Sequence, residues 1–397
     1  MLLLNTHTRH NDALDMEDAE VLGSDAAKKA ARFLSFRADH RITPLHSLSG
    51  LAKKAGVSAI HIKDESERLG MNSFKALGGS YAVICLVLEE AARKLGIPVD
   101  ISELQSPAVR EIASRMTFGC ATDGNHGKSV AAGAKMVGAK AAIFVHSGVS
   151  EERVAAIAEY GATMIRVDGT YDDSVAEAQR KCADMGWTVV SDTSWPGYER
   201  IPSLVMQGYT AMLKEVVASL PETPTHVFIQ AGVGGLAAAV AGFFDIFYGE
   251  DRPQFITVEP DRAACIFASA EADDLIKVDS TEPTIMAMLE CYEPSLVAWR
   301  ILTRKADAFM TITEEDAAET MRQLARPVDN DPPIISGESG AAGLAGLLAA
   351  VRDPDMRSTL GIDETSRIFV INTEGATDKG RYEKIVGMTA EEVKRVG

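Results

Sequence analysis

A short apolar run followed directly by glycines occupies His226–Ala237, with the sequence HVFIQAGVGGLA. The run His226–Gln230 is apolar on both faces, as in a strand that helices cover on both sides. The glycines after it let backbone N–H groups approach an oxyanion, and the helix that begins there favours negative charge. Hydrogen bonds to a charged phosphate contribute ~1.5–3 kcal/mol each, more than the ~0.3–1 kcal/mol of the helix dipole. The stretch therefore predicts an anion site; a purely structural turn is the alternative.

Alternating short apolar runs and amphipathic helical patterns extend to both sides of this stretch. Further strands are expected at Ala141–Val145, Met164–Val167, Thr188–Ser191, Phe255–Glu259 and Arg367–Asn372. Helices are expected at Glu151–Tyr160, Tyr171–Met185 and Met206–Ser219. Such alternation indicates βαβ units and parallel sheets. We therefore expect an α/β protein with two doubly wound parallel-sheet domains. The smaller domain (86–194) is expected to be inserted in the larger one (1–85 and 195–397).

Composition restricts the partners of the chain. Its 397 residues carry a formal net charge of −17, which argues against nucleic acid or an anionic membrane surface as a partner. No apolar run approaches the ~20 residues of a membrane span, and the N-terminus has no signal-peptide pattern. The 5 cysteines and 8 histidines form no cluster with zinc-ligand spacing, so no metal site is expected. We expect a cytoplasmic protein that acts on a small molecule.

One lysine stands in a suggestive setting at Asn72–Gly79, NSFKALGG. Lys75 follows a small polar pair and an aromatic residue, and two glycines come shortly after it. This setting suits an amine that forms a Schiff base with the aldehyde of pyridoxal phosphate. The alternative is a surface lysine at the start of a helix.

Two polar loops carry further candidate residues. The loop Thr122–Gly127, TDGNHG, offers Asp123 as an acid or base and Asn125 as a donor to an oxygen of a cofactor ring. An N-capping loop is the simpler interpretation of the same residues. Asp192 follows the expected strand Thr188–Ser191, and ligands of open α/β sheets bind at the carboxyl ends of strands. Partial burial is expected to raise its pKa and suit it to proton transfer; a cap or turn is the alternative.

A second cofactor competes for the glycine loop. Gly232, Gly234 and Ala237 match the dinucleotide fingerprint G-x-G-x-x-A, and Glu259 ends the next strand where a ribose-binding acid would stand. A nicotinamide-dependent oxidoreductase is therefore an alternative function. It leaves the setting of Lys75 and the loop around Asn125 unexplained.

Taken in order, these motifs resemble the fold-type II pyridoxal phosphate enzymes, the tryptophan synthase β-like family that includes serine and threonine dehydratases. The agreement runs from Thr43 to Thr373. The resemblance implies that Lys75 forms the Schiff base, Asn125 contacts the ring hydroxyl and Thr373 faces the pyridine nitrogen. It further implies cofactor binding by Gly232, Val233, Gly234, Gly235 and Glu338. A neutral hydroxyl at Thr373 would not hold that nitrogen protonated, and the milder electron sink suits β-elimination.

Finer details are most similar to the diaminopropionate ammonia-lyases of this family. They include Lys63–Ser66 before the lysine motif and Asp123 where ordinary dehydratases usually carry a serine. The resemblance implies conversion of D- and L-2,3-diaminopropionate to pyruvate and two ammonia molecules, by a homodimer. Lys75 and Asp123 would be bases on opposite substrate faces, and Asp192 would bind the β-ammonium or share in proton transfer. A dehydratase acting on serine, threonine or 3-hydroxyaspartate is the alternative within the family.

Overall fold

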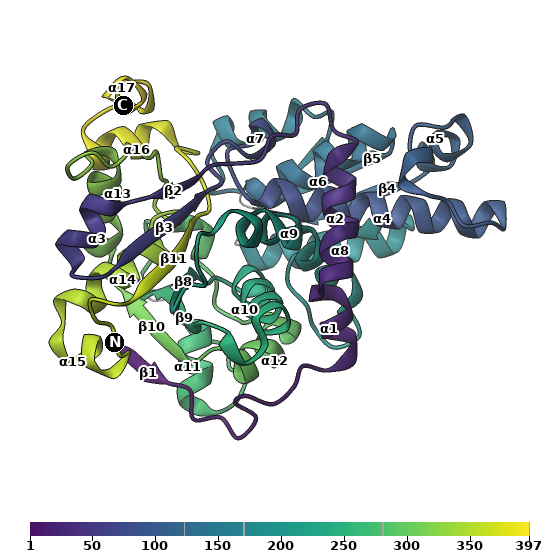
Figure 1. Ribbon diagram of the computed structural model, residues 1–397. Coiled ribbons are helices and arrows are strands. Elements are labelled where there is room, and N and C mark those ends of the chain that lie inside the picture. The colour runs from purple at the N-terminus through teal and green to yellow at the C-terminus, as the bar shows by residue number, and fades with distance from the viewer. Residues whose placement is uncertain (123, 170, 280–281, 397) are drawn as a thin grey trace. The chain divides into compact units, whose positions relative to one another are not determined.

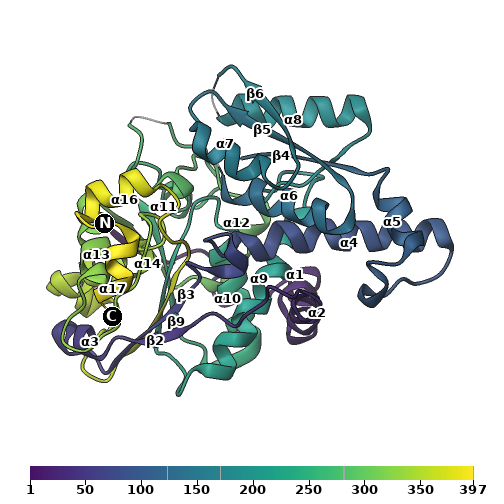
Figure 2. The same ribbon diagram turned by 90° about the horizontal axis from the view of Figure 1, so that it is seen from above.

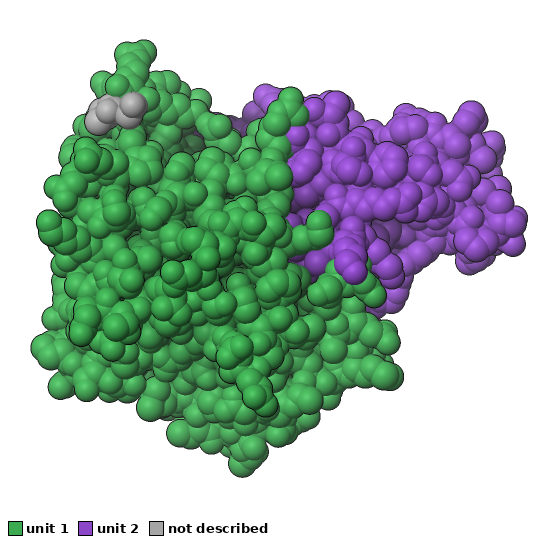
Figure 3. Space-filling view, in the orientation of Figure 1, with its two compact units in different colours: residues 1–26, 41–74, 212–397 green, residues 27–40, 75–211 purple. Residues whose placement is uncertain are grey.

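The computed structural model describes residues 1–122, 124–169, 171–279 and 282–396. The chain forms two compact units (Figure 3). Unit 1 comprises Met1–Ala26, Arg41–Phe74 and Met212–Gly397, and unit 2 comprises Ala27–His40 and Lys75–Ala211. These units change over at 26/27, 40/41, 74/75 and 211/212, whereas the predicted domains change over at 85/86 and 194/195.

The sheet of unit 1 has seven strands in the order β1-β10-β9-β8-β11-β3-β2 (Figure 1). Their bounds are β1 Leu2–Leu4, β2 Leu45–Ser47, β3 Ala59–Asp64, β8 His226–Gln230, β9 Gln254–Pro260, β10 Ala308–Ile312 and β11 Arg367–Asn372. The five central strands are parallel, and β1 and β2 pair antiparallel at the two edges. Because β8 and β11 are parallel neighbours, their carboxyl ends lie at the same end of the sheet.

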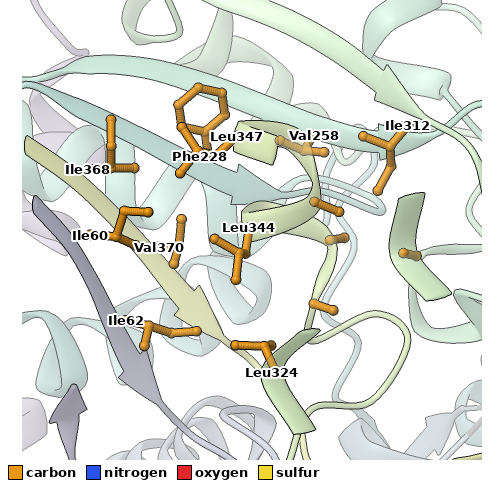
Figure 4. Close-up of a cluster of buried hydrophobic side chains, with 14 of the residues drawn as sticks. Ile60, Ile62, Phe228, Val258, Ile312, Leu324, Leu344, Leu347, Ile368 and Val370 are labelled. Atoms are coloured by element: carbon orange, nitrogen blue, oxygen red, sulfur yellow. The ribbon is translucent and has the colours of Figure 1, made fainter. Parts of the chain in front are cut away.

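Helices cover both faces of this sheet. Figure 4 shows Ile368 and Val370 of β11 in a buried cluster with Leu344 and Leu347 of helix α14 (Ala342–Arg352). Phe369, between them in the strand, points to the other face because side chains alternate along a strand. There its ring lies 5.8 Å from that of Phe244 on helix α10 (Gly235–Tyr248). Strand β8, which lies next to β11, is buried along its whole length, as its apolar sequence predicts.

Unit 2 is built on a four-stranded parallel sheet in the order β6-β5-β4-β7. Its strands are β4 Thr117–Ala121, β5 Lys140–His146, β6 Thr163–Val167 and β7 Thr188–Val189. Helix α4 (Lys75–Leu95), which begins with the lysine of interest, lies alongside helix α6 (Asn125–Val137) (Figure 2). The backbone N–H of Ser80 donates to the Ser129 hydroxyl at 2.9 Å, a contact that ties the two helices together.

The remaining helices complete the chain order. They are α1 Met16–Leu22, α2 Ser24–Ser35, α3 Ser49–Ala55, α5 Pro107–Ala113, α7 Glu151–Ala158, α8 Tyr171–Met185, α9 Arg200–Ser219, α11 Cys265–Ala272, α12 Leu296–Lys305, α13 Glu314–Ala325, α15 Pro354–Thr359, α16 Lys379–Val386 and α17 Ala390–Val396. Short 3-10 helices occupy Arg68–Gly70, Ile101–Glu103, Gly249–Asp251 and Ala287–Leu289. No helix among the described residues has the length and apolar character needed to cross a membrane.

The α/β fold with parallel sheets is confirmed. The predicted bounds of β8, β11 and α8 match the structure, and the other predicted elements are found with shifted ends. The antiparallel edge strands β1 and β2 were not predicted, because three-residue strands carry too little pattern to be recognised. Strands β3, β4 and β10 were also missed.

Candidate active site

Lys75 and Asp192 form an ion pair in unit 2. The ammonium of Lys75, the first residue of α4, donates a hydrogen bond to Oδ2 of Asp192, which follows β7. Burial opposes ionisation of this carboxyl group, but the charges of His126 and Lys75 and the hydrogen bond from Lys75 hold its pKa well below the usual range. The expected rise of the Asp192 pKa is therefore wrong, because burial acts together with a cation in direct contact. Asp192 is a carboxylate that stabilises the charged form of the lysine.

His126 is a buried neighbour of this pair that the sequence-based assignment left out. Its Nε2 lies 2.9 Å from the carbonyl oxygen of Val190, which can only accept, so Nε2 carries the proton. Its Nδ1 lies 3.9 Å from Oδ2 of Asp192. Burial lowers the pKa of His126, although Asp192 opposes that effect. The carbonyl of Val190 therefore fixes the orientation of the ring, and Nδ1 is the ring nitrogen that faces the carboxylate.

Two tyrosines complete the surroundings of the ion pair. Tyr209 on α9 is buried, and burial raises the pKa of its phenol, with Lys75 acting in the opposite direction. Gly78 makes room for it, since a Cβ there would lie 2.5 Å from Cε1 of Tyr209. Tyr198 holds the end of β7, because its hydroxyl donates to the Val189 carbonyl at 2.8 Å and accepts the Ser191 N–H at 3.0 Å. Neither tyrosine stands in a motif that could have identified it from the sequence.

The loop before α6 is capped by a threonine. The hydroxyl of Thr122 accepts the N–H groups of Gly124 and Gly127, each at 3.1 Å. Capping by the threonine means that the side chain of Asn125 is not required for this purpose. Asn125 is the first residue of α6 and is half-buried. Asp123 lies outside the described residues.

The glycine loop joins β8 to α10 in unit 1, as predicted. Gly234 precedes the helix with a φ of 95°, a backbone conformation that favours glycine. The carbonyl of Val233 accepts the N–H of Ser295 at 2.9 Å, which leaves the N–H side of the loop for other partners. The residue that precedes α10, Gly234, has no side chain with which to cap the helix. The first N–H groups of this helix therefore have no acceptor within the helix or from its N-cap residue.

Thr373 lies directly after β11, at the same end of the sheet as the glycine loop that follows β8. It is buried, and its hydroxyl oxygen accepts a hydrogen bond from Nε2 of Gln230, the last residue of β8, at 2.9 Å. Its backbone carbonyl accepts the N–H of Phe74 at 3.0 Å. Gln230 was not among the predicted site residues, because a glutamine at the end of an apolar strand carries no motif.

Glu338 is also buried, and an arginine lies beside it. Nη1 of Arg381 lies 3.4 Å from Oε1 of Glu338 and also donates to the carbonyl of Ile285 at 3.1 Å. Glu338 precedes Ser339, whose carbonyl is one of the acceptors around Gln230. The predicted contact of Glu338 with a cofactor remains a prediction.

The surroundings of Glu259 argue against a nicotinamide cofactor. Its carboxylate is fully buried and accepts the N–H groups of Ile266 and Phe267 at 2.8 and 2.7 Å, so it caps helix α11. Burial raises the pKa of Glu259 to about 8, against the lowering effect of those two N–H groups. A buried carboxyl group whose two oxygens both accept backbone N–H groups is not placed to bind a ribose, so the nicotinamide alternative loses its acid.

Each unit, taken by itself, offers groups that suit pyridoxal phosphate. The uncapped start of α10, entered through Gly232–Gly235, suits its phosphate, because N–H groups without acceptors are what a phosphate binds. The buried Thr373 hydroxyl is a neutral partner for a ring nitrogen. Lys75 offers an amine for the aldehyde. No group of three or more histidine, cysteine, aspartate or glutamate side chains in the described ranges could hold a metal ion.

A parallel-sheet fold with a lysine–aspartate pair and a glycine loop at a helix start defines a class of pyridoxal phosphate enzymes. The family described as "Pyridoxal-phosphate dependent enzyme" matches residues 37–374 of the chain. A diaminopropionate ammonia-lyase of Escherichia coli (strain K12) is 41% identical over 384 residues, which cover 95% of each chain. The corresponding protein of Salmonella typhimurium (strain LT2) is 38% identical and covers 92% of this chain and 93% of its own.

A solved structure agrees with the sequence relatives. The E. coli diaminopropionate ammonia-lyase in complex with an aminoacrylate-PLP azomethine reaction intermediate superposes with a TM-score of 0.87 at 38% identity. The match covers 97% of this chain and 96% of the other. The chain belongs to the pyridoxal-phosphate-dependent enzyme family and, within it, to the diaminopropionate ammonia-lyases.

Proposed function

We propose that this enzyme is a carbon–nitrogen lyase that converts 2,3-diaminopropionate to pyruvate and two ammonia molecules. Membership of the diaminopropionate ammonia-lyases supports the substrate. The observation that carries the chemistry is the ion pair of Lys75 and Asp192, because an elimination needs an amine that can both take and return a proton.

Bound pyridoxal phosphate supplies the aldehyde that joins the substrate amine and the ring that takes up the charge left on Cα. Lys75 is the residue that holds the aldehyde before substrate arrives. Gly232, Val233, Gly234 and Gly235 would hold the phosphate, Asn125 the ring hydroxyl and Thr373 the pyridine nitrogen. Glu338 would also contact the cofactor.

Lys75 carries out the proton transfers, assisted by its carboxylate partner Asp192. Nζ of the neutral amine accepts the Cα proton and becomes an ammonium, which Asp192 stabilises as a carboxylate. The β-nitrogen leaves as ammonia with the electron pair of its C–N bond. A neutral β-amino group takes the proton from Nζ for this, and a β-ammonium group needs none. The unsaturated amino acid that remains reacts with water to give pyruvate and the second ammonia.

Asp192 and Asp123 extend this scheme to substrate binding and stereochemistry. A carboxylate with a lowered pKa remains charged at neutral pH, so Asp192 suits a β-ammonium group as well as Lys75. Asp123 is proposed as the base on the substrate face opposite Lys75. Two bases would let both the D- and the L-isomer react.

A substrate panel tests the proposal. The purified holoenzyme is offered D- and L-diaminopropionate, serine, threonine and 3-hydroxyaspartate, and 2-oxo acid and ammonia are measured together. We expect two ammonia molecules per pyruvate from both isomers of diaminopropionate and a much lower kcat/KM for the hydroxy amino acids. A higher kcat/KM for a hydroxy amino acid would favour the dehydratase alternative.

We also propose that the enzyme acts as a cytoplasmic homodimer. The five cysteines, all within the described ranges, are free thiols, as suits a reducing compartment. Two-fold dimers are the commonest assembly of soluble enzymes. Light scattering on the holoenzyme and cell fractionation test the two parts of this proposal, and a monomeric mass or an extracytoplasmic location would refute them.

A further inference from the structure

Gln230 lies at the meeting point of three chain segments of unit 1. Its Nε2 is within hydrogen-bonding distance of four oxygens: the carbonyls of Ser339 at 3.1 Å, Gly340 at 3.0 Å and Ile371 at 3.0 Å, and the hydroxyl of Thr373 at 2.9 Å. Carbonyl oxygens only accept hydrogen bonds. Three of them around one atom therefore identify that atom as the nitrogen of the amide and fix the orientation of the side chain.

The orientation of this amide determines the direction of one hydrogen bond. An amide NH2 group donates and cannot accept, so the Thr373 hydroxyl is an acceptor in its contact with Gln230. The hydroxyl proton of Thr373 must then point elsewhere. Since both side chains are buried and their strands β8 and β11 are neighbours in the sheet (Figure 1), water has little access with which to reverse this arrangement.

We propose that Gln230 is a positioning residue that makes the Thr373 hydroxyl a hydrogen-bond donor toward the pyridine nitrogen of the cofactor. A nitrogen that accepts a hydrogen bond uses its lone pair and stays unprotonated. Gln230 thereby determines whether the pyridine nitrogen carries a proton. It acts on that nitrogen only through the Thr373 hydroxyl. This inference rests on the proposed function, in which Thr373 faces that nitrogen.

The wild-type holoenzyme gives the first test. The enzyme is loaded with pyridoxal phosphate isotopically labelled at the pyridine nitrogen, and the nitrogen NMR signal is recorded across the pH range in which the protein stays folded. We expect the signal of an unprotonated, hydrogen-bonded pyridine throughout that range. A pyridinium signal at neutral pH would overturn the inference without any substitution.

Gln230→Glu tests the residue itself. In this variant a carboxyl oxygen takes the position of Nε2, where three carbonyl oxygens would repel a charged carboxylate. We therefore expect the glutamic acid to remain protonated. Its single proton can serve only one of the four oxygens that surround Nε2 in the wild type. Its oxygen can then accept from Thr373, which turns the lone pair of the hydroxyl toward the ring. We expect the nitrogen signal to shift toward the pyridinium position, and an unchanged signal would refute the inference.

Two further variants make the outcome specific. Gln254→Glu places the same exchange at the amino end of the neighbouring strand β9 and should leave the signal unchanged. Gln230→Met, which removes the donor without adding an acid, serves if Gln230→Glu does not take up the cofactor. It should also shift the signal, and no shift would count against Gln230.

Thr373→Val separates this inference from the proposed function. If the wild-type protein takes up no labelled cofactor, the proposed function itself fails. If Thr373→Val leaves the signal unchanged, Thr373 does not contact the ring and the inference falls with that contact. If Thr373→Val shifts the signal and the Gln230 variants do not, only the role of Gln230 is refuted.

Discussion

Nζ of Lys75 donates a hydrogen bond to Oδ2 of Asp192, and the same oxygen lies 3.9 Å from Nδ1 of His126. The carbonyl of Val190 accepts the proton on Nε2 of His126, so Nδ1 is the ring nitrogen that faces the carboxylate. Lys75 is the cation in direct contact with Asp192, and both it and His126 lower the pKa of that carboxyl group. The lysine amine is held in place by an anion that remains charged at neutral pH.

Replacing Lys75 by alanine should abolish the borohydride-reducible adduct with pyridoxal phosphate, because the only proposed Schiff-base amine is removed. Absorption spectra before and after borohydride treatment measure this. Lys94→Ala, at an exposed position of the same helix α4, should retain the adduct. An unchanged spectrum in the Lys75 variant would show that another amine holds the cofactor.

Asp192→Asn should lower kcat for diaminopropionate by about 10²–10⁴-fold, the usual range for loss of an acid–base group. The amide keeps the size of the side chain but cannot balance the lysine ammonium. Single-turnover kinetics on the holoenzyme measure the effect. Asp184→Asn, at an exposed position of α8, is the matched control and should leave kcat unchanged. A similar loss in both variants would point to a general charge effect.

Asp123→Asn should reduce turnover of one enantiomer of diaminopropionate much more than that of the other. The reason is that each base is proposed to serve one face of the substrate. Separate kcat/KM values for the D- and L-isomers check this. Equal losses for both isomers would count against a face-specific base.

Gly234→Ala should weaken cofactor binding by about 1–3 kcal/mol, the cost of forcing a side chain into a left-handed backbone conformation. A Cβ at this position would also lie 2.8 Å from Cδ1 of Ile266. A loop that relaxes to avoid this contact presents different N–H groups to the phosphate. Cofactor titration gives the Kd. Gly249→Ala, also at positive φ but with open space around it at the other end of α10, should retain wild-type affinity.

Glu259 should make the protein less stable as pH rises toward about 8. The unfolded chain releases this proton near pH 4.3 (about the ordinary value for glutamate), whereas the folded chain keeps it until the raised pKa is reached. Between those values the free energy of unfolding falls by at most about 1.4 kcal/mol per pH unit from this group. Denaturant titrations over a pH series measure the slope. Glu259→Gln should lack that contribution, and the same slope in both proteins would contradict the raised pKa.

The local sequence was enough to predict strands β5, β6, β7, β8, β9 and β11 and the order of the motifs. The bounds of β8 and β11 follow from runs that are apolar on both faces, and the glycines after β8 predict the turn into α10. These features depend on residues close together in the chain, where periodicity and turn chemistry apply directly. The assignment of Lys75 came from its neighbours in sequence and from the resemblance to a family.

Only the tertiary structure decided which distant residues meet. Lys75 and Asp192 are 117 residues apart, and Gln230 and Thr373 are 143 residues apart. Strand order and register bring the members of each pair together. The spacing of residues along the chain predicts neither the order nor the register. The same holds for charge: Asp192 and Glu259 are both buried carboxyl groups, but one has a cation in contact and the other only two N–H groups. Their pKa values therefore shift in opposite directions, because burial opposes a charge and only a nearby opposite charge offsets it.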